Sequence, residues 1–290
     1  MPKTHQAEVF QEIRDLARFY QEIEEKISRV RMDLHQALQL TFPELENFFS
    51  SRVTPYALSL IEAFPHPTFV LTSTRTKIKN RLVKSTRKHI SENRAWQKAD
   101  QLLAYAQHSY PAVNSSSIHC QKTSYYACLL QDLLEQKEHL MAQMIQSAQA
   151  LEEFEIYQSI PGIGAPTAAL LIGELGDIRR FPTANQLNAF VGIDIRRFQS
   201  GNYVGKNHIN KRGNPKGRKI LYFAIRNMIR QQRAAPNHLV DYYYKLKKQP
   251  VPKKEKVATV ACMNKLLKCM HAMVRKHTRY AYTYMASNDQ

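Results

Sequence analysis

A serine in a glycine-rich, basic stretch is the residue of this sequence best suited to chemistry. Ser200 stands before Gly201, and residues 196–219 around it hold eight Lys or Arg side chains and His208. Such a setting can hold a nucleic-acid phosphate and stabilise the charge that develops on its oxygens. A serine hydroxyl is a weak nucleophile that needs a base or a metal ion beside it, and the local sequence shows no obvious His-Asp pair. The residues alone leave two interpretations open, a nucleophile and an ordinary turn serine.

The side chains around this serine also predict contacts to a DNA backbone, because Lys and Arg bind phosphates whatever the base sequence. The predicted contacts are Arg196, Arg197, Lys206, Lys211, Arg212, Lys216, Arg218 and Lys219. Aromatic residues alternate with basic ones further along the chain. We interpret Tyr222, Phe223 and Ile225 as core, whereas for residues 242–244, all tyrosines, core packing and stacking on bases are both open.

A second candidate contact is the motif Pro161-Gly162-Ile163-Gly164, which resembles a helix-hairpin-helix. Two glycines allow a phosphate to approach the backbone, and free N–H groups at the start of the next helix supply donors. Ile163 would anchor the hairpin in the core. We predict DNA binding by Gly162, Ile163 and Gly164, with an ordinary tight connection between two helices as the alternative.

Helices must position these residues, because the sequence favours helix almost throughout. Only nine glycines are present, they concentrate between about 160 and 220, and strand-like runs are few. The pattern predicts helical segments over 8–40, 54–63, 76–109, 118–151, 184–191, 216–230 and 256–277, with an irregular or β-hairpin stretch over 195–209. The predicted fold class is mainly α, a coiled-coil-like stalk followed by a mostly helical domain with a short β-hairpin or irregular insert.

The pattern of apolar residues and glycines changes near residue 151. Before it, apolar residues recur at mixed steps of three, four and seven, which is typical of a coiled coil or of a two-helix hairpin. We therefore predict a stalk over residues 1–151 and a C-terminal domain over residues 152–290. A coiled coil would make the chain a homo-oligomer, which we expect, although a folded-back hairpin explains the pattern equally well.

The formal net charge of +18 is unevenly distributed. Residues 196–279 carry 22 Lys or Arg against two acids, a net of +20, so the remainder sits near −2. This asymmetry indicates a polyanionic partner. Apolar residues interleaved with the charges predict a folded segment rather than a solubility tail. No run is long and apolar enough for a membrane span, and no secretory signal is visible, so we expect a cytoplasmic protein that makes no membrane contact.

Neither a metal site nor any other cofactor is predicted in this chain. Cys120, Cys128, Cys262 and Cys269 form no CxxC pair, and the histidines before residue 151 are scattered without ligand spacing. We interpret the cysteines as reduced, packed thiols.

The motifs of the second half stand in an order that resembles one family. They are Ser159 to Gly176, Phe181, Gln186 to Ile193, Ser200-Gly201, Lys211 to Asn214 and Arg218 to Leu221. As a set they are similar to the C-terminal domain of the Piv-like insertion-sequence transposases, which are bridge-RNA-guided DNA recombinases of the DEDD/serine type. The similarity covers about residues 155–279, and residues 13–65 resemble the middle region of the same family.

The resemblance implies a mechanism for Ser200. Family members carry a serine at the matching position, and this serine attacks a DNA phosphate to form a covalent intermediate. A separate RuvC-like domain holds divalent metal, Mg²⁺, through four acidic residues, and the metal would activate the hydroxyl. Gly162 and Gly164 match the hairpin glycines. DNA and a structured guide RNA are the implied partners.

The sequence departs from the family at its N-terminal end. The acidic domain of the family precedes the helical stalk, whereas this sequence begins with what resembles the end of that domain. We therefore expect an N-terminally truncated transposase that binds nucleic acid without cutting or joining DNA alone. Two alternatives stay open, a non-catalytic helix-hairpin-helix DNA-binding protein and a regulator that pairs with a full-length transposase.

Overall fold

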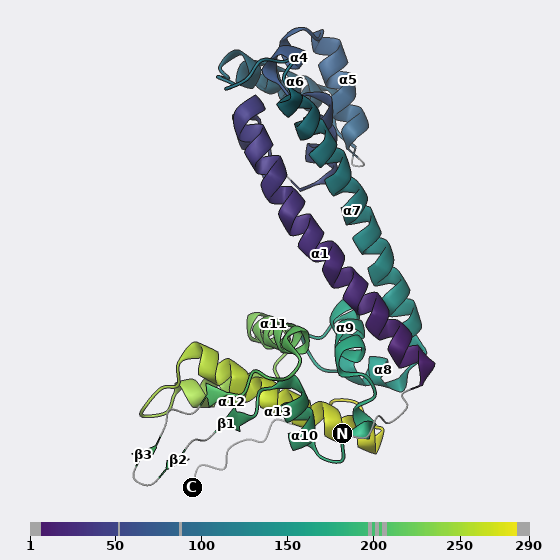
Figure 1. The fold of residues 1–290 in the computed structure, drawn as a ribbon, viewed down its shortest axis with the longest axis vertical. Helices are drawn as coiled ribbons and strands as arrows, with labels where there is room; N and C mark the ends of the chain where they lie inside the picture. Colours follow the sequence, from purple (N-terminus) through teal and green to yellow (C-terminus); the bar gives the residue numbers. More distant parts are fainter. Residues whose placement is uncertain are drawn as a thin grey trace. The chain divides into compact units, whose positions relative to one another are not determined.

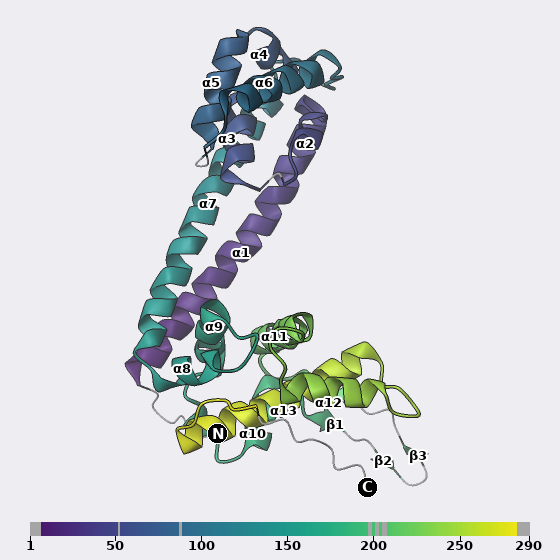
Figure 2. The same ribbon diagram turned by 180° about the vertical axis from the view of Figure 1, so that it is seen from behind.

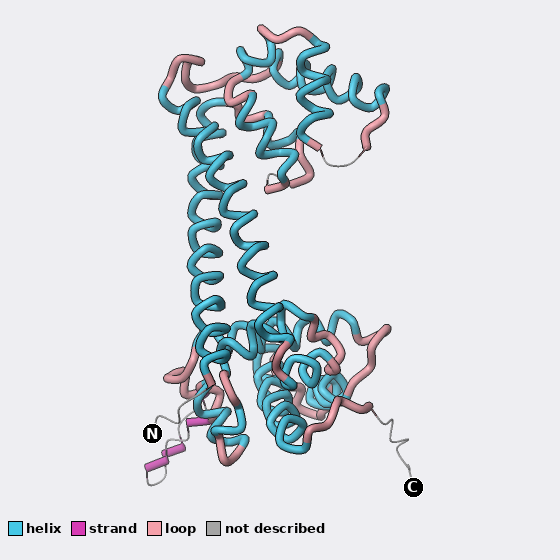
Figure 3. Tube along the Cα trace, turned by 90° about the vertical axis from the view of Figure 1, so that its right-hand side faces the viewer, coloured by secondary structure: helices cyan, strands magenta, loops and turns pink. Residues whose placement is uncertain are grey.

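A computed structural model describes residues 7–51, 53–86, 89–196, 199–200, 203–204 and 208–282. For Arg196, Gln199, Ser200, Tyr203 and Val204 it describes the backbone alone. Helices make up most of this part of the chain (Figure 3), which confirms the mainly α fold class. The chain packs into two compact units, unit 1 with residues 1–19 and 140–290 and unit 2 with residues 20–139. The division into functional domains 1–151 and 152–290 stays a prediction.

Two long helices, α1 (Glu8–Thr41) and α7 (Ile118–Gln149), each contribute residues to both units. Within unit 2 they lie side by side and antiparallel (Figures 1 and 2). Lys137 Nζ donates to Glu24 Oε1 at 2.7 Å, and Thr41 Oγ1 lies 3.2 Å from Thr123 Oγ1. The apolar stripe of α1 is buried in this arrangement. The folded-back hairpin is thus the form that the chain adopts, while a homo-oligomer stays a prediction.

The rest of unit 2 is a group of short helices whose starts follow capping signals. These helices are α2 (Leu45–Phe48), α3 (Pro55–Ala63), α4 (Pro67–Leu71), α5 (Arg75–Ser85) and α6 (Glu92–Gln107). Thr54 Oγ1 accepts from Ala57 N at 3.1 Å, and Thr74 Oγ1 accepts from Lys77 N at 3.2 Å.

The helical segment predicted over 76–109 is divided in two. The chain is extended at Thr86, which ends α5, and a new helix starts after Ser91. Ser and Thr favour such helix ends because their hydroxyl groups compete for backbone hydrogen bonds. The interruption allows α5 and α6 to pack against each other.

Unit 1 is built around α13 (Glu255–Lys276). This helix packs against five other helices, and its apolar residues form much of the core (Figures 1 and 2). The other helices of the unit are α8 (Glu152–Gln158), α9 (Ala165–Leu175), the 3-10 helix η1 (Ile178–Arg180), α10 (Ala184–Val191), α11 (Pro215–Gln231) and α12 (His238–Lys247). The sequence analysis missed α12, which Asn237 caps by accepting from Leu239 N and Val240 N, both at 3.1 Å.

The aromatic residues of this unit serve mainly as core. Tyr243 is buried and its two tyrosine neighbours pack partly against the core, which favours packing over base stacking at this position. Ile225 is buried as expected. Phe223 is 54% exposed, so its placement in the core was wrong. The buried stripe of α11 runs through Leu221, Ala224 and Met228, at steps of three and four, and Phe223 lies off that stripe.

The segment predicted as irregular or β-hairpin forms a ribbon of four two-residue strands. Strand β1 (Ile195–Arg196) pairs antiparallel with β4 (His208–Ile209), and β2 (Gln199–Ser200) pairs antiparallel with β3 (Tyr203–Val204). In Figure 3 the ribbon leads away from the helices of unit 1. The hairpin alternative is therefore confirmed for the described residues.

The four cysteines are free thiols. Cys120 and Cys262 are buried, and burial raises the pKa of Cys262 to about 11. Cys128 is exposed, so the interpretation as a packed thiol was wrong for this residue. A search of the described helices for a segment with the length and hydropathy of a membrane span found none.

Candidate nucleic-acid interface

The ribbon that carries Ser200 is fixed at its base by backbone hydrogen bonds. Asn210 N donates to Asp194 O at 2.9 Å, and Lys211 N donates to Gly192 O at 3.0 Å. Asn214 N continues this pairing by donating to Phe190 O at 2.9 Å. The two ends of the ribbon are thereby joined where α10 ends and α11 begins, and the helices of unit 1 hold them in place.

Two glycines allow the backbones at this base to touch. A Cβ atom on Gly213 would lie 2.2 Å from Phe190 O, and one on Gly192 would lie 2.6 Å from Gly213 N. Gly192 also has a φ of +77°, in the left-handed region that favours glycine. Neither position can accept a side chain unless the two backbone segments separate.

Arg218 of α11 also bonds to the backbone at the base of the ribbon. Its Nη1 atom donates to Val191 O at 2.8 Å and to Gly213 O at 3.1 Å. The sequence analysis predicted a DNA contact for this guanidinium. A DNA contact by Arg218 stays a prediction, and the structure gives the side chain a structural role at the ribbon base.

A buried carboxylate links the ribbon base to α1. The side chain of Glu174 in α9 is fully buried and accepts from Arg18 Nη2 at 2.9 Å and from Asn214 Nδ2 at 2.6 Å. Asn214 in turn caps α11, because its Oδ1 accepts from Lys216 N at 3.0 Å and from Gly217 N at 3.1 Å.

The sequence analysis did not single out Glu174 or Arg18. A signal was present, since Glu174 is the only charged residue in the apolar helix 165–175, and a carboxylate on such a face needs a partner.

The predicted DNA-contact residues fall into three groups. Lys211, Arg212 and Lys219 are exposed around the start of α11, and Lys216 beside them is partly exposed. Ser200 lies in β2 opposite Tyr203, and its backbone alone is described, as is that of Arg196 in β1. Arg197 and Lys206 lie outside the described residues. The structure thus brings the described basic side chains together at the foot of the ribbon that carries Ser200.

The predicted helix-hairpin-helix is present between α8 and α9, and its two glycines face different surroundings. Gly162 has a φ of +87°, and a Cβ atom there would lie 2.9 Å from Met228 Cγ of α11. Ile163 is buried, as expected for a residue that anchors the hairpin. Gly164 is exposed, and a Cβ atom there would meet only Pro166 Cδ, at 3.9 Å. Gly162 is therefore required for packing, and Gly164 faces open space at the start of α9.

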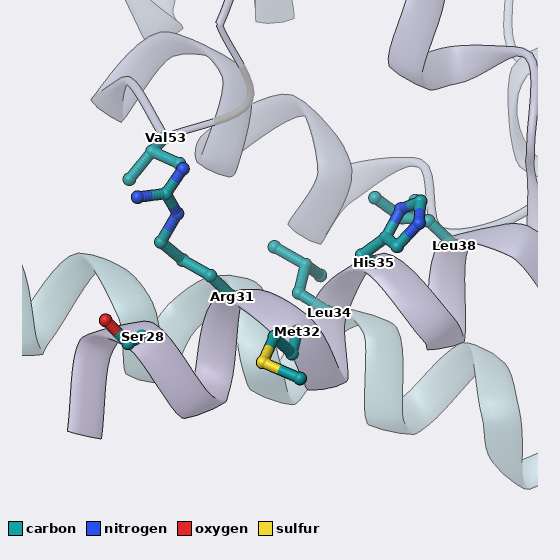
Figure 4. A pocket seen from close by; sticks show the side chains of 7 residues that line it. All are labelled: Ser28, Arg31, Met32, Leu34, His35, Leu38 and Val53. Carbon is teal, nitrogen blue, oxygen red and sulfur yellow. The ribbon is translucent and has the colours of Figure 1, made fainter. Parts of the chain in front are cut away.

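An open depression on unit 2 has no part in this interface. Figure 4 shows that it is lined by Val53 and by side chains of α1, among them Arg31 and His35. His35 Nδ1 lies 2.7 Å from Glu46 Oε1. The depression contains none of the residues predicted to act on DNA.

No three His, Cys, Asp or Glu side chains converge as a metal site would require in the part of the chain that the structure describes. The Mg²⁺ expected from the family resemblance therefore finds no set of ligands among these residues.

Comparison with known proteins shows that part of unit 1 is similar to a family of mobile-element proteins. Residues 155–240, from α8 into α12, match the family model described as "Transposase IS116/IS110/IS902 family". The chain is 36% identical over 106 residues to "Transposase for insertion sequence element IS1111A" of Coxiella burnetii, which covers 36% of this chain and 29% of the relative. It is 30% identical over 90 residues to the "Insertion element IS110 uncharacterized 43.6 kDa protein" of Streptomyces coelicolor, which covers 31% of this chain and 22% of the relative.

Each comparison thus spans less than a third of the relative's length. The expected resemblance to insertion-sequence transposases is confirmed at the level of the family that the model describes. The segment that contains the hairpin, the ribbon with Ser200 and the start of α11 is similar to the IS116/IS110/IS902 transposases.

Proposed function

We propose that this chain acts in DNA transposition, and that unit 1 binds the DNA backbone and presents Ser200 as the nucleophile toward a DNA phosphate. The observation that carries the proposal is the family match over residues 155–240. That segment encloses the hairpin, the whole ribbon and the basic start of α11.

The construction of the ribbon base supports this assignment. A nucleophile gains most from a fixed position relative to the bound phosphate. The ends of the ribbon are held by three backbone hydrogen bonds, by the contact between Gly192 and Gly213, and by Arg218. The exposed side chains of Lys211 and Arg212 adjoin this base and can bind DNA phosphates.

The proposed reaction is an exchange of phosphodiester bonds. Ser200 Oγ would form a bond to phosphorus while the bond from phosphorus to a deoxyribose oxygen breaks. The hydroxyl proton passes to a base, and the leaving deoxyribose oxygen takes up a proton. Nearby guanidinium and ammonium groups would stabilise the charge on the non-bridging oxygens.

The proposal includes two further partners. A structured guide RNA follows from the resemblance to the Piv-like, bridge-RNA-guided recombinases, and a second copy of the chain follows from the coiled-coil-like periodicity of residues 1–151. The basic surface of unit 1 suits RNA as well as DNA, because phosphate contacts do not depend on the base sequence.

The covalent intermediate provides the test. The purified full chain is incubated with Mg²⁺ and with duplex DNA that flanks its own coding sequence, and DNA adducts that survive detergent are separated and mapped by mass spectrometry. An adduct on Ser200 in the wild type that is lost in Ser200→Ala would support the proposed nucleophile, and it would overturn the expectation from the sequence that this chain alone binds DNA without cutting it. DNA binding should be equal in both, because one hydroxyl contributes little beside the basic side chains.

Ser116→Ala is the matched control. Ser116 is an exposed serine in the loop before α7, so its removal should leave the adduct intact. An adduct that persists in Ser200→Ala would refute the assignment of the nucleophile. Binding without any adduct in the wild type would favour the alternative, a DNA-binding protein without chemistry.

A further inference from the structure

Three arginines from distant parts of the sequence line one shallow depression of unit 1. Arg14 and Arg18 come from α1, and Arg212 comes from the segment between the ribbon and α11. The other residues of its lining are Phe190, Gly213, Asn214 and Pro215. The depression therefore adjoins the base of the ribbon, where Gly213 and Asn214 are bonded to the end of α10.

The positive charge of this depression is only partly neutralised. Arg18 is paired with the buried Glu174, at 2.9 Å. Arg14 and Arg212 form no ion pair with any residue that the structure describes. Two guanidinium groups thus line the depression without an ion pair among the described residues, and both would attract an anion bound there.

A fourth arginine, Arg180, lies beside the depression. The guanidinium carbon of Arg180 lies 4.9 Å from the ring centre of Phe190, and Arg180 Nε is buried without a hydrogen-bond partner. Burial lowers the pKa of Arg180, and the positive charge of Arg14 lowers it further, while Asp177 opposes this. Four arginines therefore lie in or beside the depression, and of these Arg18 alone has an ion pair among the described residues.

The start of α11 does not provide the missing anion site by itself. Asn214 already accepts from the N–H groups of Lys216 and Gly217, so the first turn of this helix has little donor capacity to spare. A ligand of the depression would be held by guanidinium groups, which bind phosphate oxygens in a bidentate manner.

We propose that this depression binds a backbone phosphate of a nucleic-acid strand, held by Arg14 and Arg212, with Arg18 fixed beside them by Glu174. The proposal rests on the proposed function, because it assigns the phosphate to the strand that unit 1 presents to Ser200. It adds α1 to the interface, although Arg14 and Arg18 lie far outside the segment 155–240 that matches the transposase family.

The test compares two double variants of the full chain. Arg14→Gln/Arg212→Gln removes the two unpaired charges of the depression. Arg29→Gln/Arg94→Gln removes two exposed arginines of unit 2 that have no ion pair in the described part of the chain. Binding to a short duplex DNA, and to a duplex RNA of the same sequence, is measured by fluorescence anisotropy over a series of KCl concentrations.

We expect the depression variant to bind roughly tenfold or more weakly than the wild type at low salt. Its slope of log affinity against log salt on DNA should be shallower by about 0.9, the loss of one phosphate contact. The control variant should keep the wild-type slope. A change on DNA, with or without a change on RNA, supports the proposal, whereas a change confined to RNA overturns the assignment of the phosphate to the strand that unit 1 presents to Ser200. Equal slopes for the depression variant and the wild type overturn it.

Thermal unfolding separates this proposal from the proposed function. Inorganic pyrophosphate should raise the melting temperature of the wild type and of the control variant, but much less that of the depression variant. Without any ligand, the depression variant should melt no lower than the wild type, because a repulsion has been removed. A wild type that binds no nucleic acid refutes the proposed function. In that case equal pyrophosphate stabilisation of all three proteins refutes the anion site as well.

Discussion

Glu174 shows how a single buried carboxylate can organise the surroundings of a site. It contacts the side chains of Arg18 and Asn214, which belong to α1 and to the cap of α11. A carboxylate in this position is stable because both donors approach its oxygens, and one of the donors carries a positive charge. The position of Arg18 beside the depression and the start of α11 therefore depend on the same side chain.

We predict that Glu174→Gln destabilises the protein by about 1–3 kcal/mol, because a neutral amide oxygen replaces the charged carboxylate oxygen, Oε2, that accepts from both Arg18 and Asn214. Glu25→Gln is the control, since Glu25 is exposed on the same α1 that carries Arg18, and it should change stability by about 0.5 kcal/mol or less. Urea unfolding measures both. A Glu174→Gln variant as stable as the wild type would show that the ion pair contributes little.

The residue types of the sequence predicted the ribbon more readily than the side chains that hold its base. Ser200 and its basic neighbours could be found because they are concentrated in one short stretch of sequence. The proximity of Arg14 and Arg212 could not be predicted from the sequence, because no local pattern connects residues from opposite halves of the chain. The role of Arg218 was also hidden, since a guanidinium that binds backbone carbonyls has the same sequence signature as one that binds DNA.

Helices and turns were predictable where their signals are local. The start of α3 follows Thr54-Pro55, and the residues of α10 coincide with the predicted range 184–191. The prediction missed α12 because three consecutive tyrosines and two lysines make up half of this ten-residue helix and leave it only three aliphatic residues. The periodicity of α1 could not distinguish a partner helix in the same chain from one in another chain, because both bury the same stripe.

The hairpin between α8 and α9 provides a prediction at this scale. Gly164→Ala should weaken binding to duplex DNA roughly tenfold, because its new methyl group projects into the open space where a phosphate would meet the start of α9. Its cost in stability should be about 1 kcal/mol or less, since the methyl group meets only Pro166. Anisotropy and thermal unfolding measure the two effects.

Gly162→Ala makes the comparison informative. Its methyl group would meet Met228, and its backbone has a positive φ, so this variant should lose stability whether or not the hairpin binds DNA. If Gly164→Ala binds DNA as well as the wild type does, the hairpin is an ordinary connection between two helices.

The distribution of charge was the clearest large-scale feature of the sequence. The excess of +20 in residues 196–279 belongs entirely to unit 1. The sequence predicted this polarity correctly because it depends on composition alone. The sharing of α1 and α7 between two compact units was not predictable, since it depends on which long-range contacts form.

We predict a steep salt dependence of DNA binding for the whole chain. Arg218 is engaged at the ribbon base, which leaves seven of the eight predicted basic contacts for phosphates. Seven phosphate contacts correspond to a slope of log affinity against log salt of about −6 on duplex DNA. Equilibrium titrations in KCl provide the slope. A slope of about −2 or shallower would mean that most of these side chains do not contact the DNA.

The contact between Gly192 and Gly213 has a consequence for how this protein can be altered. The base of the ribbon leaves no room for a side chain at either glycine, and the pairing of Arg196 with His208 continues the ribbon from that base. The base therefore fixes the two ends of the ribbon. Substitutions at Gly192 or Gly213 are therefore expected to disturb the helices of unit 1 more than substitutions elsewhere in the ribbon.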